Sequence, residues 1–417
     1  MLYWFFSFLL ISMAICQSNL VLAEDGESYF GALPAFLVQM STIFLIYIKK
    51  KYLCPKFKDD TYVNIFLYYT YLMTVLGVFY AENYIEYRQL FVGFISLHVP
   101  ILLWLFYKPS VFEGVMSRWY YFSWIPFFIL FFSKLGFVET YWDPILILLC
   151  LFPLFKKPYA IIILIIASLY IFRNIEEDRS PFIKGVVAFT VGLGVGLRNV
   201  ISNKIIRVVH VLAYLSVVFL FIYIFADLFI VISGKADASE VVAANRTRDK
   251  AYKDTRSLLY IDVLYSSIEH NYFIWGHTPA RGFEVQYSSG LFLNENTFLN
   301  KDERHKNEMV MSNIYTWEGL IGLFFFSLIY FHGSCLAVYH SKNKIVPFIG
   351  CFIAWRWAWG WVQDVNNLLC TDIGLWALMA ICYSSHFREM SDYEFRLWAR
   401  SLLSNKSRRA FHKLKKS

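Results

Sequence analysis

Long apolar runs, interrupted by short charged segments, cover most of the chain. Residues 161–172 and 208–232, for example, contain almost no ionisable side chain. A helix of about 20 such residues crosses the hydrocarbon core of a bilayer, because its backbone polar groups bond within the helix and need no water. The pattern therefore predicts an all-α polytopic membrane protein.

We predict about 12 transmembrane helices from the lengths of these runs. The first lies within residues 1–23, which we expect to stay uncleaved because they lack the basic start of a signal peptide. The second covers residues 30–48. The remaining predicted spans are 61–80, 89–107, 119–137, 144–155, 159–172, 185–197, 208–233, 314–333, 345–362 and 369–383. Residues 1–233 then form an N-terminal bundle of about nine helices, and residues 314–383 hold the C-terminal helices.

Basic residues gather at two places that predict the orientation of the chain. Five lysines lie between residues 49 and 58, and the tail at 384–417 holds nine Lys or Arg against three acidic residues. Because basic loops stay on the cytoplasmic side, we expect both termini and the loop at 108–118 in the cytoplasm. Most of the net charge of +8 therefore belongs to a basic cytoplasmic tail. We expect no nucleic-acid partner, since no base-reading module accompanies the charge.

The composition supports the membrane class and excludes several kinds of enzyme. Only 17% of the residues are charged, against about 25% in soluble proteins. The seven cysteines show no disulfide or metal-ligand spacing. No phosphate-binding glycine loop, zinc motif or cluster of carboxylates occurs, so the sequence predicts neither a cofactor nor a metal. The absence of an internal repeat disfavours a transporter built from two matching halves.

Residues 234–313 differ from the rest of the chain. They form the longest segment without an apolar run, they are mixed in charge, and they are rich in Tyr, Phe and Trp. Such length indicates a functional loop, and the aromatic content disfavours disorder. We therefore predict one large extracytoplasmic loop that folds into a small cap.

Within this cap, residues 254–275 have the apolar spacing of a helix. The stripe consists of Leu258, Leu259, Leu264 and Ile268. Arg256 falls in the first turn, where the helix dipole disfavours a cation. One interpretation is that Arg256 and the free N–H groups bind a phosphate. The alternative is an ion pair of Arg256 with Asp249 or Asp254.

A second predicted helix runs from Lys301 directly into the span at 314–333. His305, Glu308 and Ser312 would share one face of this helix, near the outer membrane surface. The alternative is an ordinary ion pair between Arg304 and Glu308 along the same helix.

One predicted span contains an arginine. Arg356 lies in the tryptophan-rich run at 355–361. An arginine inside a membrane is costly and usually lines a cavity or finds a partner. The tryptophans alone indicate only an interfacial anchor.

These features together resemble the bacterial O-antigen polymerase and O-antigen ligase family. The resemblance rests on Arg256 at the start of a helix, the glycine-rich break from Gly276 to Gly282, and a following span with a GxxG step at Gly319 and Gly322. Locally it covers residues 254–326, and in topology it covers the whole chain. It implies a GT-C-like glycosyltransferase in the bacterial inner membrane, with the large loop in the periplasm.

The resemblance also implies the substrate and partners. The donor would be an oligosaccharide on a polyprenyl pyrophosphate, and the enzyme would need no metal and no cofactor. A chain-length regulator and a flippase would be partners in the same lipid bilayer. Since pyrophosphate leaves in this reaction, arginines suit the site because they stabilise the charge bidentately.

By the same resemblance, Arg256 binds the pyrophosphate and Arg281 is a second clamp. His277 and Arg356 contribute to substrate binding. Glu308 or His305 is the base that accepts the proton of the acceptor hydroxyl. The ligases carry a histidine at the position that Glu308 occupies, so the match favours a polymerase.

Three alternatives stay open. A ligase would transfer the glycan to lipid A core. A sugar transferase that uses a polyprenyl monophosphate would place its base in the first outer loop, at Glu24 or Asp25. A flippase or transporter would carry charges in several spans and short loops on both sides, and the sequence favours it least.

Overall fold

The computed structural model describes residues 3–12, 29–54, 59–123, 139–173, 179–232, 255–286, 303–363 and 372–414. Its N-terminal helix is Tyr3–Ser12. The other helices are α2 (Tyr29–Leu53), α3 (Thr61–Tyr80), α4 (Tyr84–Leu97), α5 (Leu102–Phe106), α6 (Pro109–Phe122), α8 (Glu139–Cys150), α9 (Lys157–Arg173), α10 (Arg179–Gly196), α11 (Asn203–Ile232), α13 (Thr255–Glu269), α14 (Val310–Tyr339), α15 (Val346–Trp359), α16 (Ile373–Tyr383), α17 (Ser385–Arg388), α18 (Asp392–Ser401) and α19 (Asn405–Leu414). Two 3-10 turns, η1 (Val99–Ile101) and η2 (Phe152–Leu154), and two short strands, β1 (Phe283–Glu284) and β2 (Glu303–Arg304), complete the described elements.

The predicted all-α class is confirmed for the described residues, apart from the two-residue strands. Four helical stretches are long and apolar enough to cross a membrane: Thr61–Tyr80, Tyr84–Phe106, Asn203–Ile222 and Val310–Tyr339. Shorter apolar helices accompany them. The fold is therefore compatible with a membrane protein, while the count of about 12 spans, the large outer loop and the sides of the termini stay predictions.

Two predicted segments have a different structure. The loop expected at 108–118 is mostly helix α6, because Pro109 at the first helical position is pre-organised to start a helix. The helix expected from Lys301 is also wrong. Glu303 and Arg304 form strand β2, and α14 begins only at Val310.

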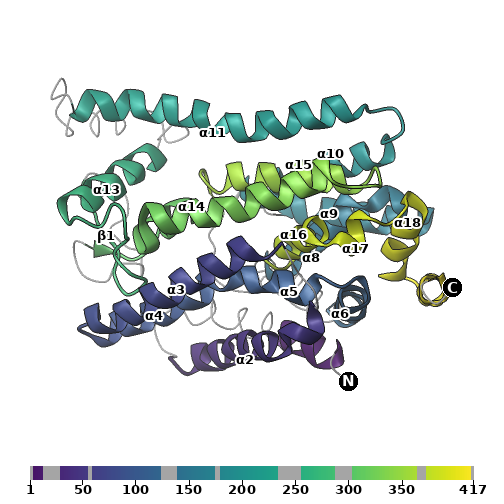
Figure 1. The fold of residues 1–417 in the computed structure, drawn as a ribbon, viewed down its shortest axis with the longest axis horizontal. Coiled ribbons are helices and arrows are strands. Elements are labelled where there is room, and N and C mark those ends of the chain that lie inside the picture. Colours follow the sequence, from purple (N-terminus) through teal and green to yellow (C-terminus); the bar gives the residue numbers. More distant parts are fainter. Residues whose placement is uncertain are drawn as a thin grey trace.

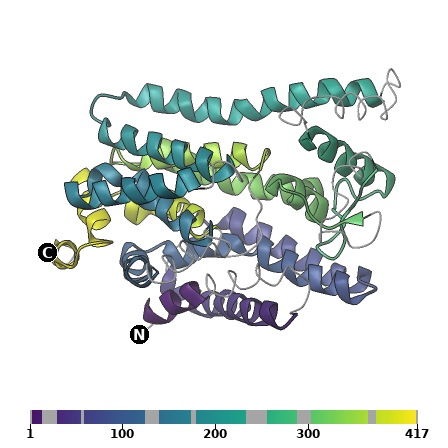
Figure 2. The same cartoon turned by 180° about the vertical axis from the view of Figure 1, so that it is seen from behind.

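The long helices run side by side along the longest axis of the molecule (Figures 1 and 2). The cap elements α13 and β1 lie at one end of this bundle, and both chain termini lie toward the opposite end (Figure 1). We call these two ends of the bundle the cap end and the tail end.

α16 forms part of the core, and every residue from Ile373 to Tyr383 is buried.

The basic tail is folded and packs against the bundle. α18 begins with a capping box, in which Ser391 Oγ accepts from the Glu394 N–H and the Glu394 carboxylate accepts from the Ser391 N–H. Its Trp398 ring contacts the rings of Phe112 and Phe387, with centroids 5.0 and 4.6 Å away. The Trp398 indole N–H donates to the Pro109 carbonyl oxygen at 3.1 Å, which joins α18 to α6.

Candidate functional site at the cap end

α13 presents an apolar face to the bundle. Its buried apolar residues are Leu258, Leu259, Tyr260, Ile261 and Val263. Ile268, which the predicted stripe placed on this face, is 63% exposed. The helix ends at Glu269, earlier than the predicted Trp275, because Asn271 adopts the left-handed conformation at φ 58°. The N–H groups of Asn271 and Tyr272 bond back to carbonyls of the last helical turns, as in a Schellman motif.

The segment after α13 crosses α14 where α14 is broken. The backbone of α14 leaves helical geometry at Gly319, with φ 64° and ψ −164°. Four backbone hydrogen bonds join the segment to both sides of this break: His277 N to Thr316 O, Thr278 N to Trp317 O, Leu320 N to Phe273 O, and Ile321 N to Ile274 O. The cap is therefore fixed to the bundle by main-chain contacts.

Two glycines make this crossing possible. A Cβ on Gly319 would lie 2.3 Å from the Ile274 carbonyl oxygen, and a Cβ on Gly276 would lie 2.4 Å from the Gly319 nitrogen. Both residues also have positive φ, which glycine adopts without cost. Gly276 of the glycine-rich break and Gly319 of the GxxG step therefore lie against each other where the two segments cross.

Glu318 lies directly before the break and is fully buried. The Thr70 hydroxyl of α3 donates to Glu318 Oε1 at 2.6 Å, while Oε2 has no hydrogen-bond partner among the described residues. A Cβ on Gly322 would lie 2.2 Å from Glu318 Cβ, so the second glycine of the step makes room for this side chain. The sequence analysis missed Glu318. Its signal was a single carboxyl group within an apolar span, which is costly unless it serves a purpose.

Arg256 lies in the first turn of α13 and is half-buried. Burial raises the pKa of Tyr260, one turn further along, and the positive charge of Arg256 opposes that shift. The Tyr260 hydroxyl donates to the Trp361 carbonyl oxygen, just beyond α15. Arg256 therefore lies where the cap meets the end of α15. Asp249 and Asp254, its alternative partners, lie outside the described residues.

Arg281 is engaged in a bidentate ion pair. Its Nε and Nη2 donate to the two carboxylate oxygens of Glu303 at 3.0 and 2.9 Å, and the Gly282 N–H donates to the same carboxylate at 2.7 Å. Burial opposes ionisation of Glu303, but these hydrogen bonds outweigh it and hold its pKa below the usual value. The pair fixes the β1–β2 hairpin, in which Phe283 pairs with Arg304. Arg281 is thus held by the cap itself.

His277 is stacked and bonded within the cap. Its ring lies parallel to that of Tyr272, with centroids 4.4 Å apart. Nδ1 and the Gly282 carbonyl oxygen are 2.8 Å apart, so Nδ1–H donates to that oxygen. Burial lowers the pKa of His277, which favours the neutral ring. His277 therefore orients the glycine-rich loop.

His305 is fully enclosed. Its Nε2–H donates to the Pro279 carbonyl oxygen at 2.8 Å, and its ring packs on Trp317 with centroids 5.0 Å apart. Burial lowers its pKa to about 3. The imidazole is therefore neutral and sealed from solvent, which suits packing better than proton transfer with an acceptor from outside.

Glu308 lies on a tight loop before α14 and is partly exposed. Asn307 shapes this loop: its side-chain oxygen accepts from Met309 N at 2.9 Å, and its side-chain amide donates to Ser312 Oγ at 2.8 Å. The Asn313 side chain closes the loop from α14, since its Oδ1 accepts from Asn307 N at 2.7 Å. The predicted helix is absent here because the backbone N–H groups of Asn307 and Met309 bond to side-chain oxygens and not to the carbonyl oxygens of a helix. The predicted pair of Arg304 and Glu308 along one helix does not form, since Arg304 lies in β2 and Glu308 in the loop before α14.

Arg356 is buried between two aspartates. Its Nη1 lies 3.5 Å from Asp143 Oδ1, and its Nη2 lies 3.9 Å from Asp372 Oδ1. Asp143 also accepts from the Leu375 N–H at 3.0 Å. Both carboxylates are nearly inaccessible. The arginine therefore ties α15 to α8 and to the start of α16, as a buried charge with nearby counter-charges requires.

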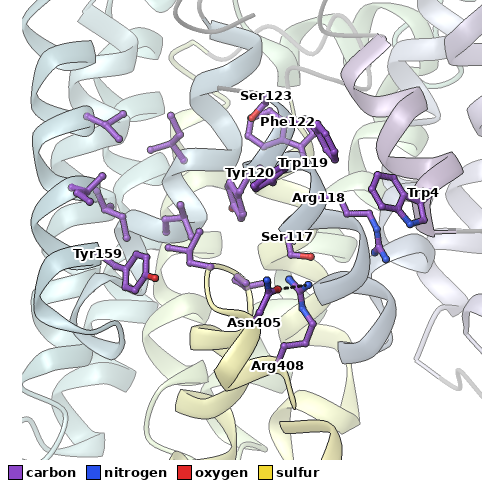
Figure 3. Close-up of a pocket in the computed structure, with 18 residues that line it drawn as sticks. Trp4, Ser117, Arg118, Trp119, Tyr120, Phe122, Ser123, Tyr159, Asn405 and Arg408 are labelled. Atoms are coloured by element: carbon purple, nitrogen blue, oxygen red, sulfur yellow. Dashed lines mark hydrogen bonds between the residues drawn. The ribbon is translucent and has the colours of Figure 1, made fainter. Parts of the chain in front are cut away.

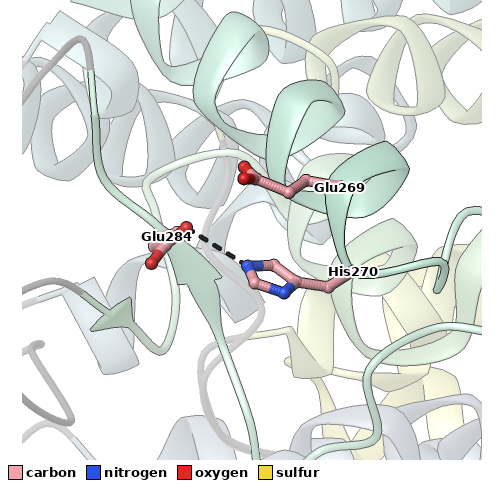
Figure 4. A group of neighbouring side chains, drawn as sticks. All are labelled: Glu269, His270 and Glu284. Atoms are coloured by element: carbon pink, nitrogen blue, oxygen red, sulfur yellow. Dashed lines mark hydrogen bonds and ion pairs between the residues drawn. The ribbon is translucent and has the colours of Figure 1, made fainter.

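A potential metal-binding group lies on the cap surface (Figure 4). Glu269, His270 and Glu284 place one ligand atom each within 4.8 Å of one another, and all three are exposed. His270 Nε2 lies 3.2 Å from Glu284 Oε2. The sequence analysis found no such set, because Glu284 comes from β1 and approaches α13 only in the folded cap.

Five of the six proposed site residues form two groups, while Arg356 is paired with Asp143 and Asp372. His277 and Arg281 belong to the glycine-rich loop, and their bonds and that of His305 hold this loop in place. Arg256 and Glu308 lie on two segments that both contact the end of α15, through the Tyr260 hydroxyl to Trp361 O and through Met311 N to Gly360 O at 3.2 Å. No protein-family model, curated protein or solved structure matches the chain.

Proposed function

We propose that the chain is a membrane glycosyltransferase that polymerises oligosaccharides carried on polyprenyl pyrophosphate. The observation that carries the proposal is that the two segments bearing Arg256 and Glu308 both contact the end of α15, through Tyr260 and Met311. This arrangement offers a cation for a pyrophosphate and a carboxylate for a hydroxyl proton at the same end of an apolar bundle. A lipid-linked glycan needs both groups beside an apolar surface.

In the proposed reaction, the acceptor hydroxyl oxygen attacks the anomeric carbon of the donor sugar. The bond from that carbon to the pyrophosphate oxygen breaks, and the electron pair leaves with the pyrophosphate. Arg256 stabilises the charge on the leaving group, and Glu308 accepts the hydroxyl proton. Arg281 and His277 position the cap loop in this scheme, since both are bonded within it.

Glu308 is the better base of the two sequence candidates. It is partly exposed on a loop that its neighbours fix, whereas His305 is sealed and its pKa is lowered to about 3 by burial. The carboxylate at this position also favours a polymerase over a ligase, because the ligase pattern calls for histidine there.

A flippase is the second candidate, and one observation favours it. Arg356, Asp143 and Asp372 form a buried charged group among apolar helices. Charges in such places often mark a transport path.

The first outer loop with Glu24 and Asp25, which the monophosphate-dependent transferase would use, lies outside the described residues.

Supplying the purified chain with a lipid-linked repeat unit and a lipid A core acceptor separates these proposals. A ladder of longer lipid-linked glycans is the expected product. A single transfer to the core would indicate a ligase. Movement of the intact donor across a vesicle membrane without any new glycosidic bond would indicate a flippase.

A further inference from the structure

A cavity of about 610 Å³ is lined by α6, α8, α9, the N-terminal helix and the segment from the end of α18 into α19 (Figure 3). These helices lie toward the tail end of the bundle, away from α13 and β1 (Figure 1). Nothing in the proposed glycan chemistry uses this space.

The wall formed by α8 and α9 is mostly aliphatic. It consists of Ile145, Leu148, Ile162, Ile163 and Ile166, together with Tyr159. Figure 3 shows Tyr159 of this wall across the cavity from Ser117 and Arg118. Such a wall binds a hydrocarbon chain through burial of apolar surface, at about 0.8 kcal/mol for each buried CH₂.

The opposite side carries two arginines. Arg118 of α6 lies over the Trp4 ring at 4.8 Å, and its Nη1 donates to the Gly114 carbonyl oxygen. Arg408 of α19 pairs with Glu113 through Nε and donates from Nη1 to Asn405 Oδ1 at 3.1 Å. Glu113 is the carboxylate that pairs with Arg408, and it also bonds His412, so the charge of Arg118 leaves this side of the cavity with a surplus of positive charge.

A buried hydroxyl group adds an independent observation. Ser117 lines the cavity beside Arg118 and is only 6% exposed. Its Oγ has no hydrogen-bond partner among the described residues, and neither has the Arg118 Nε. Buried polar groups normally have partners. Both atoms are inaccessible in this conformation, so rotation of the Ser117 or Arg118 side chain presents an unpaired donor to an acceptor in the cavity.

We propose that this cavity binds an anionic phospholipid. The phosphate lies at Ser117, Arg118 and Arg408, and one acyl chain lies along the wall of α8 and α9. The phosphate supplies the oxygen acceptors that Ser117 and Arg118 lack, and its charge balances the surplus positive charge. The tail end also carries the basic helix α19, and basic segments associate with anionic lipid. The inference does not depend on the proposed glycosyl transfer.

The test uses the purified full chain and native mass spectrometry. Phosphatidylglycerol is compared with phosphatidylcholine of the same acyl chains and with inorganic phosphate. We expect one tightly retained phosphatidylglycerol per chain, and weaker retention of the other two. Equal retention of phosphatidylcholine would overturn the charge-based site. Equal retention of inorganic phosphate would overturn the role of the acyl chain.

Three variants sharpen the test. Arg118→Gln removes charge-assisted hydrogen bonds and is expected to weaken phosphatidylglycerol binding about tenfold or more. Ile166→Trp fills the apolar part of the cavity, leaves the arginines in place and should also weaken binding. Arg409→Gln removes the same charge from an exposed position that does not line the cavity and should bind like the parent chain. Parent-like binding by both Arg118→Gln and Ile166→Trp would overturn the proposal.

Discussion

Among single residues, Arg256 is defined by its place in the first turn of α13, one turn before Tyr260, whose hydroxyl bonds to the end of α15. Arg256→Lys keeps the charge but loses the parallel N–H donors of the guanidinium, so we expect impaired polymerisation, and Arg256→Ala should nearly abolish it. The measurement is the ladder of lipid-linked glycans made by equal amounts of purified chain. Arg88→Ala is the matched control, because Arg88 is an exposed arginine of α4.

Normal ladders from Arg256→Ala would contradict the assignment of the pyrophosphate to this residue. Catalysis would then have to be sought around Arg356 or in the first outer loop.

Glu308 and His305 are distinguished by their surroundings, so their variants should fail in different ways. A catalytic base contributes about 10² to 10⁴ in rate, and Glu308→Gln should therefore slow the reaction at least about tenfold while the thermal midpoint stays unchanged. His305→Ala leaves the Pro279 carbonyl oxygen without its buried donor, which costs about 1–3 kcal/mol of folding free energy. We expect a lower thermal midpoint there.

The measurements are initial rates and thermal unfolding of both variants at several pH values. A rate loss in His305→Ala at unchanged thermal midpoint, together with a normal rate in Glu308→Gln, would make His305 the base instead.

Among elements, the sequence was most informative where packing alone decides the structure. The apolar run predicted α3 at its observed bounds, Thr61–Tyr80. The prediction of a helix from Lys301 was wrong, because the side chains of Asn307 and Asn313 accept hydrogen bonds from backbone N–H groups that a helix would use. The apolar pattern also missed the early end of α13 at Asn271, where the signal was an asparagine able to adopt positive φ.

The crossing of the cap over α14 gives a prediction about stability. Gly319→Ala would place a Cβ 2.3 Å from the Ile274 carbonyl oxygen and force a strained positive φ. We expect a loss of about 2 kcal/mol or more in folding free energy, and protease cleavage in the cap. Gly196→Ala is the control, since its Cβ would meet only ordinary contacts with Pro153 at 3.5 Å.

Thermal unfolding and limited proteolysis of both variants provide the measurement. Equal unfolding midpoints and equal cleavage patterns would show that the Gly276–Gly319 contact does not hold the cap.

At the scale of the whole molecule, the two ends have different chemistry. The cap end carries Arg256, Glu308 and the charged hairpin, whereas the tail end carries the basic helices and the apolar cavity. The sequence predicted a separate cap and a separate basic tail, because the mixed, aromatic segment at 234–313 and the basic segment at 384–417 differ in composition from the apolar runs. Contacts such as Glu318 with Thr70 were not predictable, since they join helices 248 positions apart.

Whether the reaction depends on a metal concerns the whole cap, because the potential ligands come from two segments, the end of α13 and β1. The sequence predicts a metal-independent reaction, in which Arg256 neutralises the leaving pyrophosphate. Glu269, His270 and Glu284 nevertheless gather on the cap surface as three potential ligands, with His270 Nε2 and Glu284 Oε2 3.2 Å apart. Their exposure and their own pairing favour a surface contact, so we expect full polymer length in EDTA and from Glu284→Gln. Chain-length analysis of the purified enzyme, with and without EDTA and added Mg²⁺ or Mn²⁺, checks this. Loss of polymer in EDTA that a divalent ion restores, together with the same loss in Glu284→Gln, would replace the arginine mechanism with one in which the cap binds a metal.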